Sequence, residues 1–147
     1  MRYKPHLIIM LSGVFLFLDQ FLKWQSWHGW GESKIILKYF GWQPFLNTGV
    51  AFGLPVPSWL TVIVTVPIIL GAGVWVGYDI MVRKNVSGVM MGAVMLIFTG
   101  AFSNLADRMM YGVVVDYFKF FTGVVNLADG MIVCGAGVVI LRLKIED

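Results

Sequence analysis

Residues 104–130 read NLADRMMYGVVVDYFKFFTGVVNLADG, and this stretch carries Asp107, Asp116 and Asp129 between two long apolar runs. The tetrad Asn-Leu-Ala-Asp opens the stretch and recurs near its end. The chain as a whole is 59% hydrophobic and 13% charged, whereas soluble domains have ~25% charged residues. A carboxylate near membrane depth is costly and is therefore usually paired or functional. The three acids indicate a polar site within an apolar chain.

Four apolar runs have the composition expected of membrane-spanning helices, for which ~20 residues is the usual length. The first and last runs are short, so their polar ends should lie near the water interface. We therefore predict an all-α polytopic membrane protein, with residues 1–147 forming one membrane-embedded domain. The predicted spans run over about residues 7–22, 59–80, 86–106 and 127–143.

The basic residues predict how the chain is oriented, because short loops rich in Lys and Arg remain cytoplasmic. With four spans, three basic pairs fall on one side and place both termini in the cytoplasm. No small-residue cleavage site follows the first run, so we interpret it as a retained anchor and not as a signal peptide. The basic pairs are Arg2 with Lys4, Arg83 with Lys84, and Arg142 with Lys144.

The long outer segment, residues 24–58, does not have the composition of an ordinary soluble loop. It is rich in tryptophan, which favours the headgroup layer of a membrane. Its part KIILKYFGWQPFLN (34–47) has the β-branched and aromatic character of a short strand or hairpin. We predict a small extracytoplasmic β platform at the membrane boundary. The tryptophans in or beside the segment are Trp24, Trp27, Trp30, Trp42 and Trp59.

Several kinds of function find little support in the composition. The net charge of +3 does not suggest nucleic-acid binding. Cys134 is the only cysteine, which excludes an internal disulfide and a cysteine metal site. His6 and His28 lie far apart in sequence and on opposite predicted sides of the membrane, so no Ser-His-Asp arrangement is indicated. The Asp and Asn residues could instead hold a hard cation such as Mg²⁺ or Ca²⁺, but we expect no metal and no cofactor.

The first span ends with DQFLK, which places Asp19 and Lys23 four residues apart. On a helix this spacing puts both side chains on one face, with the acid nearer the N-terminus, the better orientation for an ion pair. The plainest interpretation is a salt bridge that anchors the span at the interface. Further along, NTGVAFG (47–53) indicates a turn that leads back to the membrane.

The three central aspartates have different local settings. Asp107 precedes Arg108, and a nearby cation favours the ionised form, so Asp107 is a poor candidate for holding a proton. Asp116 follows three valines, and an apolar setting raises a carboxyl pKa. Asp129 would lie three residues after a helix cap at Asn126, as in a variant of the capping box. Two carboxylates from different segments could share one proton and activate water, as in aspartic proteases.

The motifs and their order along the chain resemble the lipoprotein signal peptidases, or signal peptidase II, a bacterial family with four spans. The resemblance covers most of the chain. It departs from the family at Ser103, where Gly is usual, at Val125 and Tyr117, and in the short stretch 117–128. The matching stretches are Asp19-Gln20 with Lys23, NTGVAF (47–52), GAFSNLADR (100–108), VVDY (114–117) and NLAD (126–129).

The resemblance implies an aspartyl endopeptidase of the inner membrane that cleaves diacylglyceryl-modified prolipoproteins just before the lipidated Cys, at the outer face. Asp116 and Asp129 would be catalytic, membrane lipid would be a partner, and globomycin-type peptides would inhibit. A small proton-coupled transporter with an aspartate relay and a noncatalytic assembly factor are the alternatives. The implied binding and supporting residues are Asn47, Asn104, Arg108, Asn126, Asp19, Lys23 and Asp107.

Overall fold

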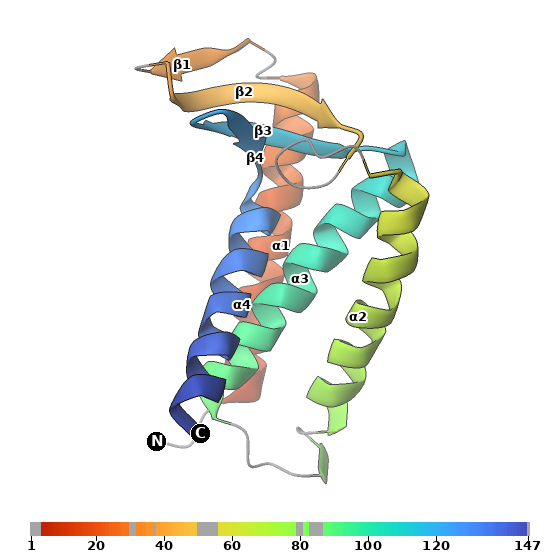
Figure 1. Ribbon diagram of the computed structural model, residues 1–147, viewed down its shortest axis with the longest axis vertical. Helices are drawn as coiled ribbons and strands as arrows, with labels where there is room; N and C mark the ends of the chain where they lie inside the picture. Colours follow the sequence, from red (N-terminus) through yellow and green to blue (C-terminus); the bar gives the residue numbers. More distant parts are fainter. Residues whose placement is uncertain are drawn as a thin grey trace.

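A bundle of helices is capped at one end by an antiparallel sheet in the computed structural model of the chain (Figure 1). The structure describes residues 4–29, 32–36, 38–49, 56–78, 81–82 and 87–146. Within them, the helices are α1 (Pro5–His28), α2 (Ser58–Tyr78), α3 (Gly88–Tyr111) and α4 (Leu127–Glu146). The strands are β1 (Lys34–Ile36), β2 (Phe40–Asn47), β3 (Val114–Phe120) and β4 (Gly123–Val125).

The distribution of polar side chains is inverted relative to a soluble protein. Large apolar side chains such as Phe17, Ile68 and Val74 are exposed on the helices, whereas Asp19, Lys23 and other polar groups are buried. Helices α1, α2 and α3 are long and apolar enough to cross a membrane. The chain is therefore a mostly helical, multi-pass membrane protein, because only lipid makes such an exterior favourable.

The first helix is longer than the sequence predicted. We expected a span over about 7–22 and the platform from residue 24, and both bounds are wrong because α1 continues to His28. Asp19, Gln20 and Lys23 do not end the helix, since their polar groups bond to side chains of α3 and are satisfied inside the bundle. Helix α3 likewise extends beyond its predicted end near 106.

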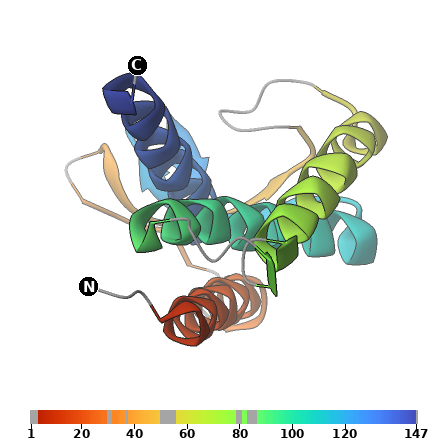
Figure 2. The ribbon, with the colours of Figure 1, turned by 90° about the horizontal axis from the view of Figure 1, so that it is seen from below.

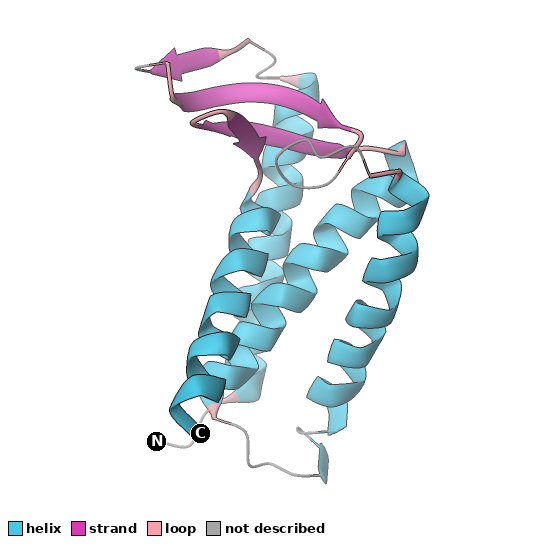
Figure 3. Ribbon diagram, viewed as in Figure 1, coloured by secondary structure: helices cyan, strands magenta, loops and turns pink. Residues whose placement is uncertain are grey.

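The platform is a four-stranded antiparallel sheet of order β1-β2-β3-β4 at one end of the bundle (Figure 3). The predicted hairpin within 34–47 is confirmed as β1 and β2. We did not predict β3 and β4, which come from the segment between the last two helices and complete the sheet. The register pairs Phe45 with Asp116, so β2 helps to hold this aspartate at the inner part of the sheet.

Helix α3 lies between α1, α2 and α4 when the bundle is viewed along its length (Figure 2). Gly112 ends it with a φ of 74° and donates its N–H to Arg108 O, so the chain turns directly into β3. Where α3 meets α4, a Cβ on residue 100 would lie 2.5 Å from Ala128 O, and one on residue 135 would lie 2.5 Å from Ala93 O. Glycine therefore allows the close approach of these two helices.

Replacing Gly100 by Val should separate the first turn of α4 from α3. The added side chain meets the backbone carbonyl of Ala128, beside Asp129, and that carbonyl cannot move without moving the helix. We expect at least a tenfold loss of the peptidase activity that the resemblance implies, because small displacements of catalytic groups are costly. Thermal unfolding and activity measured in the same detergent check this, with Gly92→Val, where a Cβ meets nothing within 4 Å, as the control.

Candidate active site

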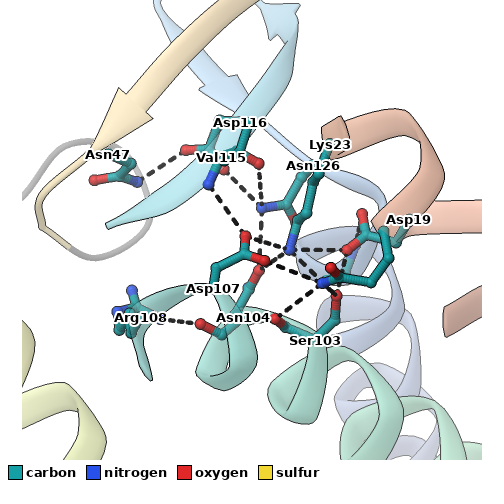
Figure 4. Close-up of polar contacts among 12 residues, drawn as sticks. Asp19, Lys23, Asn47, Ser103, Asn104, Asp107, Arg108, Val115, Asp116 and Asn126 are labelled. Atoms are coloured by element: carbon teal, nitrogen blue, oxygen red, sulfur yellow. Dashed lines mark hydrogen bonds and ion pairs between the residues drawn. The ribbon is translucent and has the colours of Figure 1, made fainter. Parts of the chain in front are cut away.

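Asp116 lies on β3 and is 1% exposed, at the end of the sheet that faces the helices. Its Oδ2 accepts a hydrogen bond from Asn47 Nδ2 at 2.9 Å, and its Oδ1 accepts one from Asn126 Nδ2 at 2.7 Å (Figure 4). Asn47 is itself fixed, because its Oδ1 accepts the N–H of Gly49 at 2.9 Å. The register of β2 and β3 thus brings together an asparagine and an aspartate that are 69 residues apart.

Asp129 lies in the first turn of α4, where it takes part in a capping arrangement. Its N–H donates to Asn126 Oδ1 at 2.9 Å, and the N–H of Asn126 donates to Asp129 Oδ2 at 3.4 Å. The predicted capping box is therefore confirmed. Asn104 Nδ2 donates to the other carboxyl oxygen, Oδ1, at 2.9 Å. Although it caps the helix, the side chain of Asp129 is only partly buried, so a bound molecule can still reach its carboxyl group.

Asn126 links the two carboxyl groups directly. Its amide nitrogen donates to Asp116 while its amide oxygen and backbone N–H engage Asp129. The same amide nitrogen also donates to Asn104 Oδ1 at 3.1 Å. Three separate segments therefore meet at one constellation of two aspartates and two asparagines. They are the last part of α3 with Asn104, the middle of β3 with Asp116, and the start of α4 with Asn126 and Asp129.

The environment of Asp116 favours its protonated form. Burial, and then the charge of Asp129, raise the pKa of Asp116 from 3.8 to about 7, against the opposing effect of the hydrogen bonds from Asn47 and Asn126. A carboxyl group with this pKa holds its proton over much of the range below neutral pH. The raised pKa of Asp116 agrees with the prediction made from the three apolar valines that precede it in the sequence.

Beneath the aspartates lies a buried ion cluster of Asp19, Lys23 and Asp107. Lys23 Nζ is 2.9 Å from Asp19 Oδ2 and 2.9 Å from Asp107 Oδ2 (Figure 4). The predicted pair of Asp19 and Lys23 is confirmed, but it is buried within the protein and does not lie on its surface. The ion-pair partner of Asp107 is Lys23, whereas the sequence had directed attention to Arg108.

Further polar residues complete the cluster, and the sequence had not assigned them a role. Tyr117 Oη donates to Asp19 Oδ1 at 3.0 Å and accepts the N–H of Leu127 at 2.9 Å. Burial raises the pKa of Tyr117, so its hydroxyl stays protonated. Ser103 and Gln20 bond to the same cluster. Tyr117, Ser103 and Gln20 each belong to a motif quoted above, and membership of that motif was the only sign in the sequence that they have a role. Their contacts are shown by the structure alone.

Arg108 points away from the ion cluster. Its Nη2 donates to Gly49 O at 3.0 Å and its Nη1 to Asn104 O at 3.4 Å, whereas its Nε is buried and has no hydrogen-bond partner among the described residues. Arg108 thus ties α3 to the turn after β2. The NTGVAF motif is described only as far as Gly49, so its residues 50–52 lie outside the described residues.

An apolar cleft of about 440 Å³ opens between α2, α3 and α4 and reaches the constellation. Only part of its wall is polar, and this polar part includes Asn104, Arg108 and Asp129, so Asp129 is the aspartate that faces the cleft. The arrangement can bind an extended apolar molecule in the cleft and hold a polar group of that molecule, such as a carbonyl, beside the two carboxyl groups. The apolar lining consists of Val56, Leu60, Val64, Ala101, Ile132 and Val133.

Comparison with known proteins gives one consistent result. The model of the family described as Signal peptidase (SPase) II matches residues 11–145. A lipoprotein signal peptidase of Pelotomaculum thermopropionicum is 45% identical over 109 residues, which cover 72% of this chain and 69% of the relative. One from Serratia marcescens is 31% identical over 92% of this chain and 83% of the relative.

Solved structures agree with the sequence comparisons. One described as a bacterial membrane enzyme superimposes with a TM-score of 0.81 at 25% identity, over 97% of this chain and 90% of that chain. A second, of the same description, gives a TM-score of 0.77 at 25% identity, over 97% of this chain and 95% of that chain. The similarity therefore extends over the helices and the sheet together.

Proposed function

Since the chain belongs to the signal peptidase II family and is an aspartic peptidase that processes lipoproteins, we propose that Asp116 and Asp129 are its catalytic pair. One observation carries this assignment: Asn126 contacts both carboxyl groups, since its amide nitrogen donates to Asp116 and its backbone N–H donates to Asp129, which borders the apolar cleft. The transporter alternative is not favoured by the family match.

The proposed substrate is a diacylglyceryl-modified prolipoprotein, cut just before the lipidated cysteine. The cleft between α2, α3 and α4 is lined mostly by apolar side chains, which suits the apolar signal segment and its lipid. Arg108 borders the cleft with a buried Nε that has no partner in the described part of the chain. We assign this N–H to a carbonyl oxygen of the bound peptide, because an unsatisfied buried donor is costly.

The two aspartates divide the chemistry between them in our mechanism. Asp129 lies at the N-terminus of α4, where the helix dipole stabilises a negative charge, and it accepts two hydrogen bonds. It draws a proton from water, whose oxygen attacks the scissile carbonyl. Asp116, with its pKa raised to about 7, donates a hydrogen bond to the developing oxyanion.

Collapse of the tetrahedral intermediate then completes hydrolysis. The carbon–nitrogen bond breaks, and the proton that Asp129 took from water passes to the amine of the lipidated cysteine. The products are a signal peptide with a new carboxylate and a lipoprotein with a free N-terminal cysteine. The asparagines keep both aspartates oriented through each step, since Asn47 and Asn126 donate to Asp116, Asn104 donates to Asp129, and Asn126 also donates to Asn104.

The test of the proposed function is direct cleavage. Purified protein in detergent is incubated with a prolipoprotein whose cysteine carries diacylglyceryl, and the mass of the product N-terminus is measured. The expected product begins at the lipidated cysteine, and the same substrate without the lipid should be cut far more slowly. Cleavage elsewhere, or ion flux in vesicles without cleavage, would contradict the proposal. A globomycin-type peptide should inhibit by occupying the cleft, and a strong chelator should not.

The rate of cleavage should fall as the pH rises through about 7. Asp116 must hold a proton to act as the acid, and its pKa is raised to about 7 by burial and by the charge of Asp129. The protonated form is therefore present below this pH and lost above it, which gives the basic limb of a bell-shaped profile. Because the two carboxyl groups are coupled, both limbs belong to the pair. A rate that stays constant from pH 6 to 9 would contradict this division of roles.

We further propose that all four helices span the bacterial inner membrane, with both termini cytoplasmic and the sheet outside. α1 begins and α4 ends at the end of the bundle opposite the sheet (Figure 1). Helix α4 is apolar between Asp129 near its start and Arg142 near its end, which fits a span with both ends at the water interface.

Cysteine labelling should reveal this orientation. Cys134 is exposed, so it is first replaced by Ala. A water-soluble maleimide added outside should then label Glu32→Cys, in the outer segment, and not Lys144→Cys, near the end of α4. The reverse pattern would overturn the proposed orientation and with it the outer placement of the site.

A further inference from the structure

Ser103 is a fully buried residue of α3 that directly precedes Asn104. Its hydroxyl donates to Asp19 Oδ2 at 2.6 Å and accepts from Gln20 Nε2 at 2.8 Å and from Lys23 Nζ at 3.2 Å (Figure 4). A serine hydroxyl has one donor and two acceptor sites, and all three are used here. Three side chains of α1 are thus tied to one atom of α3.

Lys23 stands at the junction between the ion cluster and the aspartates. Its ammonium group donates to Asn104 Oδ1 at 2.9 Å as well as pairing with Asp19 and Asp107. Asn104 Oδ1 also accepts from Asn126 Nδ2. Since donors occupy its oxygen, the amide of Asn104 is held with Nδ2 toward Asp129, to which it donates at 2.9 Å.

The position of Lys23 therefore decides which way the amide of Asn104 faces. Without the hydroxyl of Ser103, Asp19 Oδ2 loses a short hydrogen bond and retains Lys23 as its partner there. The ammonium group is then drawn toward Asp19 and away from Asn104. Asn104 would be less firmly oriented, and Asp129 would lose part of the stabilisation of its carboxylate form.

We propose that Ser103 is a positioning residue for the catalytic pair, acting through Lys23 and the amide of Asn104 on Asp129. The proposal rests on the proposed catalytic role of Asp129. The relay runs from α1 through α3 to the first turn of α4. It depends on this chain's own residue 103, where the family resemblance implies glycine, so the hydroxyl is an addition to the expected site.

The first experiment compares Ser103→Ala with wild type in kcat, KM and pH profile. Ser103→Ala should lower kcat about tenfold and leave KM within about twofold, because Ser103 does not line the cleft. The acid limb of the pH profile should move to higher pH, because Asp129, which must be ionised, loses part of the hydrogen bonding from Asn104 that stabilises its carboxylate. The charged groups that act on Asp129 are Lys23 and Asp19 from α1, Arg108 from α3 and Asp116 from β3, and none of them is altered.

A matched control is Ser12→Ala. Ser12 is buried on α1, and its hydroxyl donates only to Ile8 O of its own helix, at 3.0 Å. This variant removes the same atom from a buried serine without touching the relay. It should keep the wild-type pH profile and turnover, and a shift equal to that of Ser103→Ala would assign the effect to general loosening of the bundle.

The second experiment is a double-mutant cycle with Asn104→Ala. If Ser103 acts through Asn104, then Ser103→Ala should have little further effect on kcat in the Asn104→Ala background. Ser103→Thr keeps the hydroxyl and should restore most of the activity and the acid limb. If Ser103→Ala does not fold, Ser103→Cys, with its weaker donor, provides the same comparison.

The outcomes separate this inference from the proposed function. Wild-type cleavage with an unchanged profile in Ser103→Ala overturns the positioning role alone. An equal loss in both backgrounds of the cycle also overturns it, because the hydroxyl would then act by another route. Failure of the wild-type protein to cleave the lipidated substrate contradicts the proposed function itself.

Discussion

Replacing Asp116 or Asp129 by Asn should each lower kcat about a thousandfold or more. An amide has nearly the shape of the carboxyl group but can neither accept a proton from water nor supply an acidic one. Asp129→Asn can still accept one hydrogen bond at the start of α4, and Asp116→Asn replaces a carboxyl group whose protonated form is favoured with another neutral group, so both variants should remain folded and inserted. Turnover measured with the lipidated substrate, beside thermal unfolding, checks the prediction.

The control for this pair is Glu32→Gln, the same carboxyl-to-amide change at an exposed position outside the site, which should leave turnover unchanged. Asp107→Asn should keep more activity than the Asp116 and Asp129 variants, because Asp107 contacts Lys23 and the backbone of Val115 and neither of the proposed catalytic aspartates. Near-normal turnover by Asp116→Asn or Asp129→Asn would remove that residue from the mechanism.

Lys23→Met should destabilise the protein by about 3–5 kcal/mol, the cost of leaving buried charge unpaired. Lys23 is 3% exposed, and its partners Asp19 and Asp107 are 0% and 1% exposed. Removing the ammonium group leaves both carboxylates buried without their cation and deprives Asn104 of a donor. The measurement is the unfolding temperature in detergent, which should fall clearly below that of wild type.

Two further variants make this prediction specific. Lys119→Met is the control, since Lys119 is only partly buried and bonds to Gln43 Oε1 at 3.1 Å on the sheet, and it should change the unfolding temperature little. Adding Asp107→Asn to Lys23→Met removes one of the two unpaired charges and should recover part of the lost stability. No recovery in the double variant would show that the loss arises from packing and not from charge.

Much of the architecture follows from short-range features of the sequence. Apolar runs of nearly span length predicted the helices, because lipid allows only a backbone with its own hydrogen bonds satisfied. The β-branched and aromatic stretch 34–47 predicted the hairpin of β1 and β2. The sequence did not reveal β3 and β4, because a strand such as β4, only three residues long, is stabilised by the neighbour with which it pairs.

The helix ends show the same limit. Polar residues at 19, 20 and 23 predicted an early end to α1, and the prediction was wrong because their partners on α3 lie 80 or more residues away in the sequence. A polar side chain ends a membrane helix when water must satisfy it. The helix continues when another helix supplies the hydrogen-bond partner. The sequence of one segment alone does not reveal whether such a partner exists.

For the site, the sequence by itself determined the residue types and their local settings: two aspartates, one after three valines and one three residues after a cap at Asn126. Hydrogen bonds between near neighbours and the local polarity are enough to fix such features. Only the tertiary structure decided that Asn126 joins Asp116 to Asp129, that Lys23 and not Arg108 pairs with Asp107, and that Ser103 belongs to the network. Those contacts depend on how closely α1, α3, α4 and the sheet approach, and that approach is set by packing over the whole chain.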